Sequence, residues 1–366
     1  MGRLQEVLGQ KESKGGLVVQ EILALQKKIV PELVEVLEKR YNILRTIYYN
    51  QPIGRRVLAS ELNLGERIVR TEISFLKSQG LIEVNTPGMS VTEEGKILVK
   101  SLKEFIHELK GLDDIEESIK NYLGLKDVII IPGDVDNNPT VLKDLGKAAS
   151  SYIKKIIKNN NIIAITGGST IKEVVEAFPK MNNISDVLVV PARGGMGRKV
   201  ESQANTLAAS LAKKINASYK LLHIPENVST EVLDGLLKES QIKDVINSIQ
   251  KADILIYGIG NAIHMAKKRE SSEEFIKKLE DMGAIGEAYG CYFNKECQMI
   301  SENNSIGINL KNAKKITTHI AVAAGKNKID AIIATEMYNN NAVLVTDEST
   351  GKAICEIMKK SSLNKL

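Results

Sequence analysis

The chain has 366 residues, too many for one ordinary hydrophobic core, and its length favours two domains. Hydrophobic residues make up 43% and charged residues 26%, a balance that excludes a disordered or membrane-embedded chain. The net charge of +5 is too small to indicate nucleic-acid binding unless the positive residues are concentrated in one place.

The first residues lack the apolar core of a signal peptide, and no apolar run is long enough to span a membrane. We therefore expect a cytoplasmic protein with no membrane partner. The three cysteines, Cys291, Cys297 and Cys355, are too few and too unevenly spaced for a disulfide framework. Cys291 and Cys297 have no histidine pair at zinc-finger spacing, so reduced thiols and no metal are expected.

Residues 17–37 carry apolar side chains at helical spacing, with a break expected at Pro31. This helical segment either extends the first domain or contributes to contacts between subunits. A further helix is expected over residues 39–49.

Residues 55–110 follow the order of a winged helix-turn-helix domain. Two helices are predicted at 55–62 and 66–79, with a short turn between them. Two strands at 81–84 and 90–92 form a hairpin around Pro87 and Gly88, and a helix follows to residue 110. We predict that residues 1–110 form a DNA-binding domain and residues 111–366 a second domain, joined by a linker at 110–119.

Positive charge is concentrated in the first domain. Eight basic and three acidic residues lie between Lys39 and Gln79. In the predicted second helix, Val69, Ile73 and Leu76 share one face, which leaves the other face free.

In helix-turn-helix proteins the second helix enters the major groove, where arginine pairs with guanine and hydroxyl groups bond to bases. The candidates for base contacts are Arg67, Arg70, Thr71 and Ser74. The candidates for phosphate contacts are Arg55, Arg56 and Lys77. The alternative is a solvated basic helix in a winged helix that binds protein.

After Gly111, short β-rich runs alternate with helical stretches. Several runs are apolar throughout, such as 128–131 and 187–190, which is typical of strands buried on both faces of a parallel sheet. We predict a doubly wound, mostly parallel, Rossmann-like α/β domain. Its expected strands are 127–132, 162–166, 186–191, 219–224, 254–258, 316–322 and 342–346.

An anion site is predicted where the strand 162–165 leads into a helix. The connecting residues are Thr166, Gly167, Gly168, Ser169 and Thr170. Glycines let backbone N–H groups converge, hydroxyl groups add donors, and the positive end of the helix favours an anion. A plain tight turn with Ser169 as the helix cap is the alternative.

Three more groups follow predicted strands: Arg193 with its glycines, Gly258 to Gly260, and Gly325 with Lys326. The carboxyl ends of parallel strands meet at one edge of the sheet, where ligands bind. Arg193 and Lys326 offer two separated cations, which suits a ligand with more than one anionic group. Glu287 is a candidate for bonding sugar hydroxyl groups, although taken alone a surface charge is the simpler interpretation.

Five groups of residues carry a resemblance to a known family: 66–81, 167–170, 191–205, 258–260 and 283–287. Over nearly the whole chain they resemble the SorC/DeoR class of sugar-binding transcriptional regulators. The resemblance implies a repressor of glycolytic genes, a homodimer or homotetramer whose hold on operator DNA weakens when fructose-1,6-bisphosphate binds. It further implies the effector contacts Ser169, Thr170, Arg193, Gln203, Lys268, Glu287 and Lys326. Where the family often has arginine, this chain has Lys268 followed by Arg269, so either side chain is a candidate.

The second domain also resembles sugar-phosphate isomerases of the glucosamine-6-phosphate type. Those enzymes carry a Gly-x-Gly-x-Asp-Gly-His segment in which the aspartate and histidine transfer protons. Here His264 is kept but Ala262 stands at the aspartate position. Loss of that carboxylate costs about 10²-fold or more in rate. We therefore predict a regulator without catalytic residues or a cofactor, with an isomerase-like enzyme carrying a winged helix as the alternative.

Overall fold

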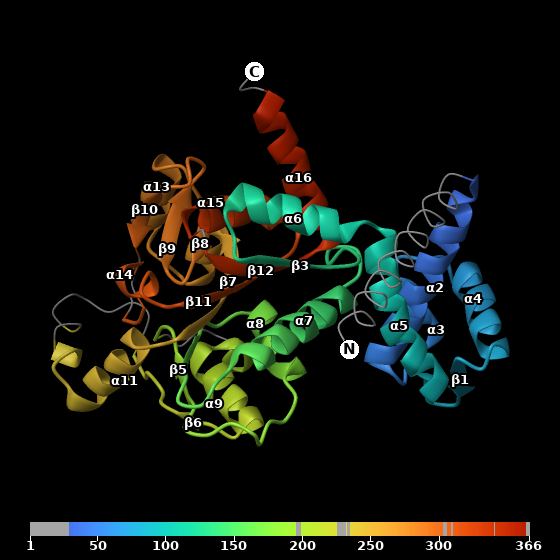
Figure 1. Cartoon of the computed structure of the whole chain (residues 1–366), viewed down its shortest axis with the longest axis horizontal. Coiled ribbons are helices and arrows are strands. Elements are labelled where there is room, and N and C mark those ends of the chain that lie inside the picture. The colour runs from blue at the N-terminus through green and yellow to red at the C-terminus, as the bar shows by residue number, and fades with distance from the viewer. Residues whose placement is uncertain are drawn as a thin grey trace, which may run out of the picture. The chain divides into compact units, whose positions relative to one another are not determined.

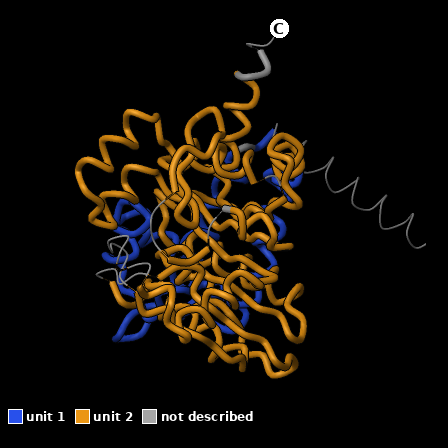
Figure 2. Tube along the Cα trace, turned by 90° about the vertical axis from the view of Figure 1, so that its left-hand side faces the viewer, with its two compact units in different colours: residues 1–113 blue, residues 114–366 orange. Residues whose placement is uncertain are grey.

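The computed structural model describes residues 29–194, 199–224, 232, 235–302, 306–308, 310–339 and 341–363. The chain forms two compact units, residues 1–113 and residues 114–366 (Figure 2). Most of the predicted helical segment 17–37 lies outside the described residues. No described helix is both long enough and apolar enough to cross a membrane.

The N-terminal unit has the predicted order of helix, turn, helix and hairpin (Figure 1). Its two strands pair antiparallel, with Ile82 opposite Val91. The winged-helix prediction is confirmed. The elements are α2 (Pro31–Asn50), α3 (Arg55–Glu61), α4 (Glu66–Ser78), β1 (Ile82–Asn85), β2 (Gly88–Val91) and α5 (Glu93–Leu109).

Helix α2 differs from the prediction of two helices. Pro31 lies in its first turn, where the missing N–H costs no hydrogen bond, and the helix then continues without a break to Asn50. Its second half buries Tyr41, Leu44 and Ile47 in the core of this unit. The segment up to residue 37 and the further helix expected at 39–49 are thus one helix, because no residue between them interrupts the backbone. The break expected at Pro31 is present, since residue 29 is helical and Val30 is not.

The boundary between the units, after Asp113, falls within the predicted linker 110–119, but most of this segment is helical. Helix α6 (Leu112–Leu123) begins two residues after α5 ends, and Gly111 takes a positive φ of 61° in the turn between them. Leu112, Ile119 and Leu123 are buried. Their spacing is that of one helix face, which explains why these residues form a helix.

The C-terminal unit is built on a twisted sheet whose main part is parallel, as predicted. The parallel strands lie in the order β6, β5, β4, β7, β11, β12, β3. Helices α7, α8 and α9 cover one face, and α6, α15 and α16 cover the other (Figure 1). The strands are β3 (Asp127–Ile131), β4 (Ile162–Ile165), β5 (Leu188–Pro191), β6 (Ser218–Tyr219), β7 (Ile254–Asn261), β11 (Thr318–Val322) and β12 (Ala342–Asp347).

The remaining elements connect these strands. They are α7 (Thr140–Ile156), α8 (Ser169–Ala177), η1 (Val200–Ser202), α9 (Ala204–Ile215), α11 (Ser240–Gln250), α12 (Ala262–Lys268), α13 (Glu273–Asp281), α14 (Leu310–Ala313), η2 (Lys326–Lys328), α15 (Ile329–Tyr338) and α16 (Glu348–Leu363). Strands β4 and β7 are neighbours, but the chain leaves β4 toward β5 and leaves β7 toward β11. In doubly wound sheets ligands bind outside the carboxyl ends of the strands at such a reversal, and we refer to this place, at the ends of β4 and β7, as the crevice.

Two strand predictions are wrong in extent. The predicted strand 219–224 is reduced to β6, because the side-chain amide of Asn205 donates to and accepts from the backbone of Leu222 in place of a ladder. Strand β7 runs beyond residue 258 to Asn261 and pairs antiparallel with β8 (Ala284–Ala288). The hairpin continues through β9 (Cys291–Asn294) and β10 (Met299–Glu302), neither of which was predicted.

Candidate functional site

The structure places the predicted DNA-contacting side chains on an open surface. In α4, Val69, Ile73 and Leu76 are buried as predicted. All seven candidate residues are exposed, namely Arg55, Arg56, Arg67, Arg70, Thr71, Ser74 and Lys77. Helices α3 and α4 therefore present these cations and hydroxyl groups outward.

Three other basic residues of the same stretch serve the fold instead. Arg45 is 1% exposed and donates to Asn42 at 2.9 Å. Lys39 and Arg40 each lie 2.9 Å from the buried carboxylate of Glu72. Burial alone would raise the pKa of Glu72, but the hydrogen bonds from the two cations outweigh it and lower the pKa. The five cations predicted to contact DNA remain on the surface.

The hydroxyl groups of Thr71 and Ser74, the two that were predicted to contact bases, are partly engaged within α4. Thr71 donates to the carbonyl of Arg67 at 3.1 Å, and Ser74 donates to the carbonyl of Arg70 at 2.9 Å. In this arrangement each hydroxyl offers DNA its acceptor lone pairs and not its proton. Hydrogen-bond donation to bases then falls to Arg67 and Arg70.

Neutralising Arg55 or Arg56 should change how DNA binding depends on salt. We expect Arg55→Gln and Arg56→Gln each to reduce the slope of log K against log salt by about one, because each removes one phosphate contact. Fluorescence anisotropy over a salt series measures the slope. The control Lys100→Gln removes an exposed cation of α5 and should leave the slope unchanged. Equal slopes for all variants would contradict the assignment.

The predicted anion site has its glycines in special positions. Gly168 is the N-cap of α8 with φ 125°, a conformation that favours glycine, and no side chain caps this helix. The interpretation of Ser169 as the cap is therefore wrong. The N–H of Gly168 donates to the carbonyl of Ser202 at 2.8 Å, so the groups that can face an anion are those of Ser169 and Thr170.

Gly167 and Gln203 lie beside this turn. A Cβ atom at Gly167 would be 2.7 Å from the carbonyl oxygen of Ser202, too close for any other residue. Gln203 follows Ser202 directly and is the N-cap residue of α9. The segment that includes Ser202 and Gln203 therefore packs against the turn between β4 and α8.

Gly258 and Gly260 belong to β7. The prediction had placed them in a loop after a shorter strand, and it is wrong on this point. Gly260 lies opposite Glu287 in the pairing of β7 with β8. A Cβ atom at Gly260 would be 2.6 Å from Cγ of Met265. This close packing requires glycine and brings Glu287 to the carboxyl end of β7.

Glu287 joins two arginines in a buried cluster. Its Oε1 lies 3.5 Å from Nη1 of Arg193 and 3.0 Å from Nη2 of Arg269, and it accepts the N–H of Gly290 at 2.7 Å. Glu287 is 2% exposed. The interpretation as a surface charge is therefore wrong, and this carboxylate is already engaged by donors of the protein.

Lys268, the last residue of α12, and Arg269, which follows it, have different partners. Arg269 reaches Glu287, whereas Lys268 is exposed and close enough to Lys328 for its charge to act on that side chain. Burial lowers the pKa of Lys328, the charge of Lys268 lowers it further, and Asp136 and Asp347 oppose this. Sequence reasoning missed Lys328, although its place two residues after Lys326 was a usable signal.

Lys326 lies at the other side of the crevice, after β11. Its ammonium group is exposed and 3.4 Å from Oδ2 of Asp134, and its N–H donates to Asp136 at 2.9 Å. The strand register places Ile165 beside both Pro191 and Ile256, and Gly258 beside Val322. The ends of β5, β4, β7 and β11 therefore follow one another along a single edge of the sheet.

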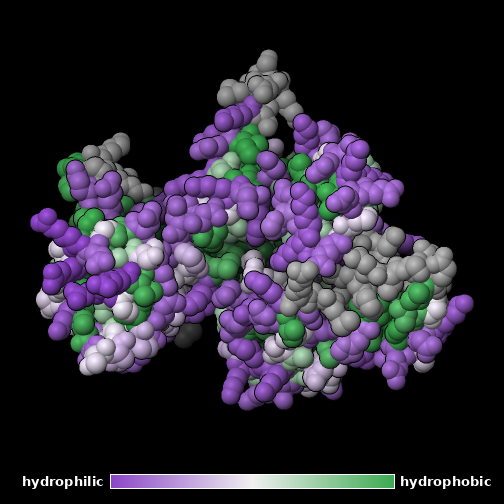
Figure 3. All heavy atoms as spheres, turned by 180° about the vertical axis from the view of Figure 1, so that it is seen from behind, coloured by the Kyte–Doolittle hydropathy of each residue, from purple (hydrophilic) through white to green (hydrophobic). Residues whose placement is uncertain are grey.

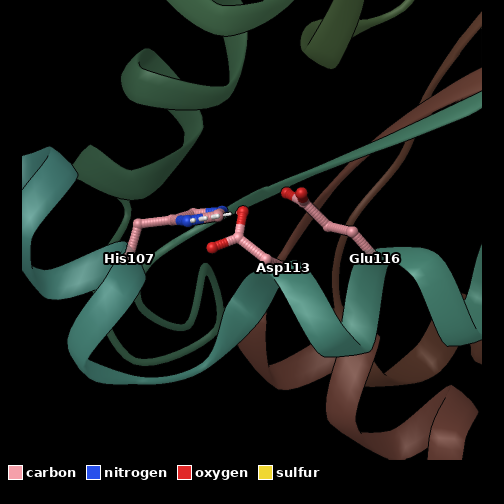
Figure 4. A group of neighbouring side chains, drawn as sticks. All are labelled: His107, Asp113 and Glu116. Carbon is pink, nitrogen blue, oxygen red and sulfur yellow. Dashed lines mark ion pairs between the residues drawn. The ribbon is translucent and has the colours of Figure 1, made fainter. Parts of the chain in front are cut away.

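A histidine and two carboxylates lie near the junction of α5 and α6 (Figure 4). The His107 ring is 3.6 Å from Asp113, and Glu116 lies one turn farther along α6. Glu116 accepts the N–H of Ile130 at 2.6 Å, which fixes α6 to β3. We assign no metal to these residues.

The segment that matched the isomerases is placed as a helix start. Asn261 caps α12 by accepting the N–H of His264 at 3.0 Å. Ala262, at the position of the catalytic aspartate, is buried, and His264 is exposed. A methyl group at that position accepts no proton.

Known proteins match both units. Residues 36–106 match the family model of the CggR N-terminal DNA binding domain, and residues 107–356 match that of a "Putative sugar-binding domain". The chain is 40% identical to the central glycolytic genes regulator of Bacillus subtilis (strain 168), covering 91% of this chain and 98% of that protein. It is 39% identical to the regulator of the same name from Priestia megaterium, covering 92% and 98%.

Solved structures agree with the fold. A SorC-family transcriptional regulator from Enterococcus faecalis aligns with a TM-score of 0.62 at 34% identity, covering 66% of this chain and 99% of that chain. The full-length sorbitol operon regulator from Klebsiella pneumoniae aligns with a TM-score of 0.62 at 17% identity, covering 88% and 98%. The second likeness concerns the fold alone.

The winged helix and the sugar-binding α/β unit together define a DNA-binding transcriptional regulator. The relatives are named as regulators and the chain carries their DNA-binding domain, which agrees with the prediction of a regulator and not of an isomerase-like enzyme. The chain belongs to the SorC family of sugar-binding transcriptional regulators.

Proposed function

We propose that the protein represses glycolytic genes in the bacterial cytoplasm and is induced by a phosphorylated sugar, with fructose-1,6-bisphosphate as the effector. Two relatives at about 40% identity are named central glycolytic genes regulators, which supports the choice of genes. The observation that carries the choice of ligand is the open N-terminus of α8, which has cations on both sides along the sheet edge.

One phosphate is proposed to bind at the N–H groups and hydroxyls of Ser169 and Thr170. The uncapped helix end supplies donors and a favourable dipole for such an anion. Arg193 follows β5 and Lys326 follows β11, so they lie on opposite sides of the pair β4 and β7. This separation supports a ligand with two anionic groups.

Other residues of the crevice are given supporting roles. Gln203 lies beside the cradle and is proposed to bond the ligand through its amide. Glu287 is proposed to hold Arg193 and Arg269 in position, which replaces the expectation that it reads sugar hydroxyl groups. Lys268 adds positive charge near Lys326 and Lys328, and Gly167, Gly168, Gly258 and Gly260 permit close approach of the backbone.

Induction is proposed to act through a homodimer or homotetramer on operator DNA. An effector shifts an equilibrium only by its difference in affinity for two states, so the sugar phosphate must bind more tightly to the form that holds DNA weakly. Each tenfold difference in affinity corresponds to about 1.4 kcal/mol.

Operator binding with and without effector tests this function. Anisotropy of a labelled duplex from the promoter region of the glycolytic genes should show lower affinity or lower cooperativity when fructose-1,6-bisphosphate is added. A binding curve that no sugar phosphate alters would reject the proposal.

Two substitutions test the effector site directly. Thr170→Val removes a hydroxyl without changing the side-chain shape, and Arg193→Ala removes a charged donor. Each should weaken effector binding at least about tenfold in calorimetry, since a hydrogen bond to a charged group contributes about 1.5–3 kcal/mol. DNA affinity without effector should not change.

A matched control uses the opposite edge of the sheet. Thr317, just before β11, donates to the carbonyl of Asp253 at 3.1 Å. Thr317→Val makes the same chemical change as Thr170→Val at a distance from the crevice, and effector affinity should remain that of the parent. Parent-like effector affinity for Thr170→Val and Arg193→Ala would refute the site.

A further inference from the structure

The recognition helix carries an isoleucine on its outer side. Ile68, the third residue of α4, is 45% exposed, although its neighbour Val69 is fully buried. Single exposed hydrophobic residues are common on proteins, and on the face shown in Figure 3 they lie in separate patches among hydrophilic side chains. Exposure alone is therefore no sign of a binding contact. The position of Ile68 in the recognition helix is the informative feature.

Ile68 lies among the predicted base-contacting residues. Thr71 is three residues farther on, so its side chain lies beside that of Ile68 on the surface of α4, and Arg67 directly precedes Ile68 in the first turn. The first residues of a recognition helix are those that meet base edges in the major groove. An exposed aliphatic side chain at this position faces DNA in any complex that uses this helix in that manner.

The polar side chains around Ile68 can account for only part of base recognition, which leaves a role for an apolar contact. The hydroxyl protons of Thr71 and Ser74 are donated to carbonyl groups of the helix itself. The hairpin of β1 and β2, residues 82–91, contains no lysine or arginine and one glutamate. Of α4 and the hairpin, α4 therefore has the side chains that are suited to distinguishing bases.

We propose that Ile68 recognises the 5-methyl group of a thymine in the operator. That methyl group is the apolar feature of the major-groove edge and distinguishes thymine from the other bases. Contact with it removes the exposed aliphatic surface of Ile68 from water. The inference rests on DNA binding by the N-terminal unit and is independent of the proposed effector and gene set.

Replacing thymine by deoxyuridine tests the contact, because uracil pairs like thymine but lacks the methyl group. Duplexes are first selected from a random library by the full-length protein without any sugar phosphate. Each thymine is then replaced singly and the affinity is measured by anisotropy. At one thymine in each half-site we expect the parent protein to lose about fourfold in affinity, the factor for burying one methyl group.

The variant Ile68→Ala should lose this sensitivity. Its affinity for the thymine duplex should fall to its affinity for the uracil duplex, so that the ratio of the two is close to one. Ile97→Ala is the matched control, because Ile97 is 67% exposed on α5 of the same unit. It should keep the full ratio of the parent.

Ile68→Ser, which carries no methyl group, gives a second variant if the alanine variant has a lower Tm. Loss of the uracil effect in either folded variant supports the contact. A parent protein insensitive to every replacement overturns it, and so does an unchanged pattern of sensitivity in both variants. Because no effector is present, failure of the proposed induction would leave this result intact.

Discussion

Glu287→Gln should lower the free energy of unfolding of the C-terminal unit by about 3–5 kcal/mol, the loss typical of removing one partner from a buried ion pair. Glu287 is buried and its Oε1 lies within 3.5 Å of Arg193 and 3.0 Å of Arg269. A neutral amide at this place leaves two guanidinium groups without the charge that they share. The cost is large because Glu287 is only 2% exposed and Arg193 only 7%, so solvent compensates little of the lost charge.

Urea unfolding followed by circular dichroism measures this loss, with the two units treated as separate transitions. Glu280→Gln, at an exposed position of α13, is the control and should change stability by less than about 0.5 kcal/mol. A loss below about 1 kcal/mol for Glu287→Gln would show that the arginines do not depend on this carboxylate.

A second large effect is expected at Glu336, a carboxyl group buried where α15 packs against β7. Its Oε1 accepts the Tyr257 hydroxyl at 2.9 Å, and Asn339 links that hydroxyl to His319. Glu336 is 0% exposed, and its Oε2 has no hydrogen-bond partner within the described part of the chain. Burial raises the pKa of Glu336 to about 8.

This pKa makes stability depend on pH with a definite sign. Between the ordinary pKa of 4.5 and about 8, the folded chain keeps a proton that the unfolded chain releases. Stability therefore falls as pH rises through this range, by at most about 1.4 kcal/mol per pH unit. Burial lowers the pKa of His319 below 6.5, which gives the opposite slope under that pH. The fall is expected to be visible between about pH 6.5 and 8.

Glu336→Gln should remove this fall and raise stability at pH 7 by about 2–3 kcal/mol, since glutamine has no proton to lose. Its carbonyl can still accept the Tyr257 hydroxyl. Thermal unfolding at several pH values between 6.5 and 8 measures the slope for both proteins. A parent slope that persists in the variant would assign the pH dependence to another group.

Local patterns predicted the winged helix and the parallel strands because each helix or strand is determined by a short run of residues. The spacing of Val69, Ile73 and Leu76 marks one helix face, and apolar runs such as β12 mark strands covered on both sides. Helix α6 was missed because its charged residues were taken for a linker, although Leu112 and Ile119 follow the helical period.

Features that depend on pairing between distant residues could not be predicted. Strand β8 extends the sheet only because β7 runs past Gly258, and nothing local in the sequence shows that continuation. The bonding of Glu287 to Arg193 joins residues from different strands, so burial of this carboxylate becomes visible only in the fold. The common location of the turn 166–170, Arg193, Gly258 to Gly260 and Lys326 was predictable, because parallel strands align their carboxyl ends at one edge of the sheet.

The hydrogen bond from Gly168 to the carbonyl of Ser202 makes the turn that we propose binds the effector dependent on a neighbouring segment. A substitution that displaces Ser202 would free this N–H and alter the shape presented to an anion without touching any ligand atom. Evolution can in this way retune the sensitivity of such a receptor from outside its pocket. Efforts to redirect the protein toward another metabolite should therefore include residues 199–202 in the randomised library.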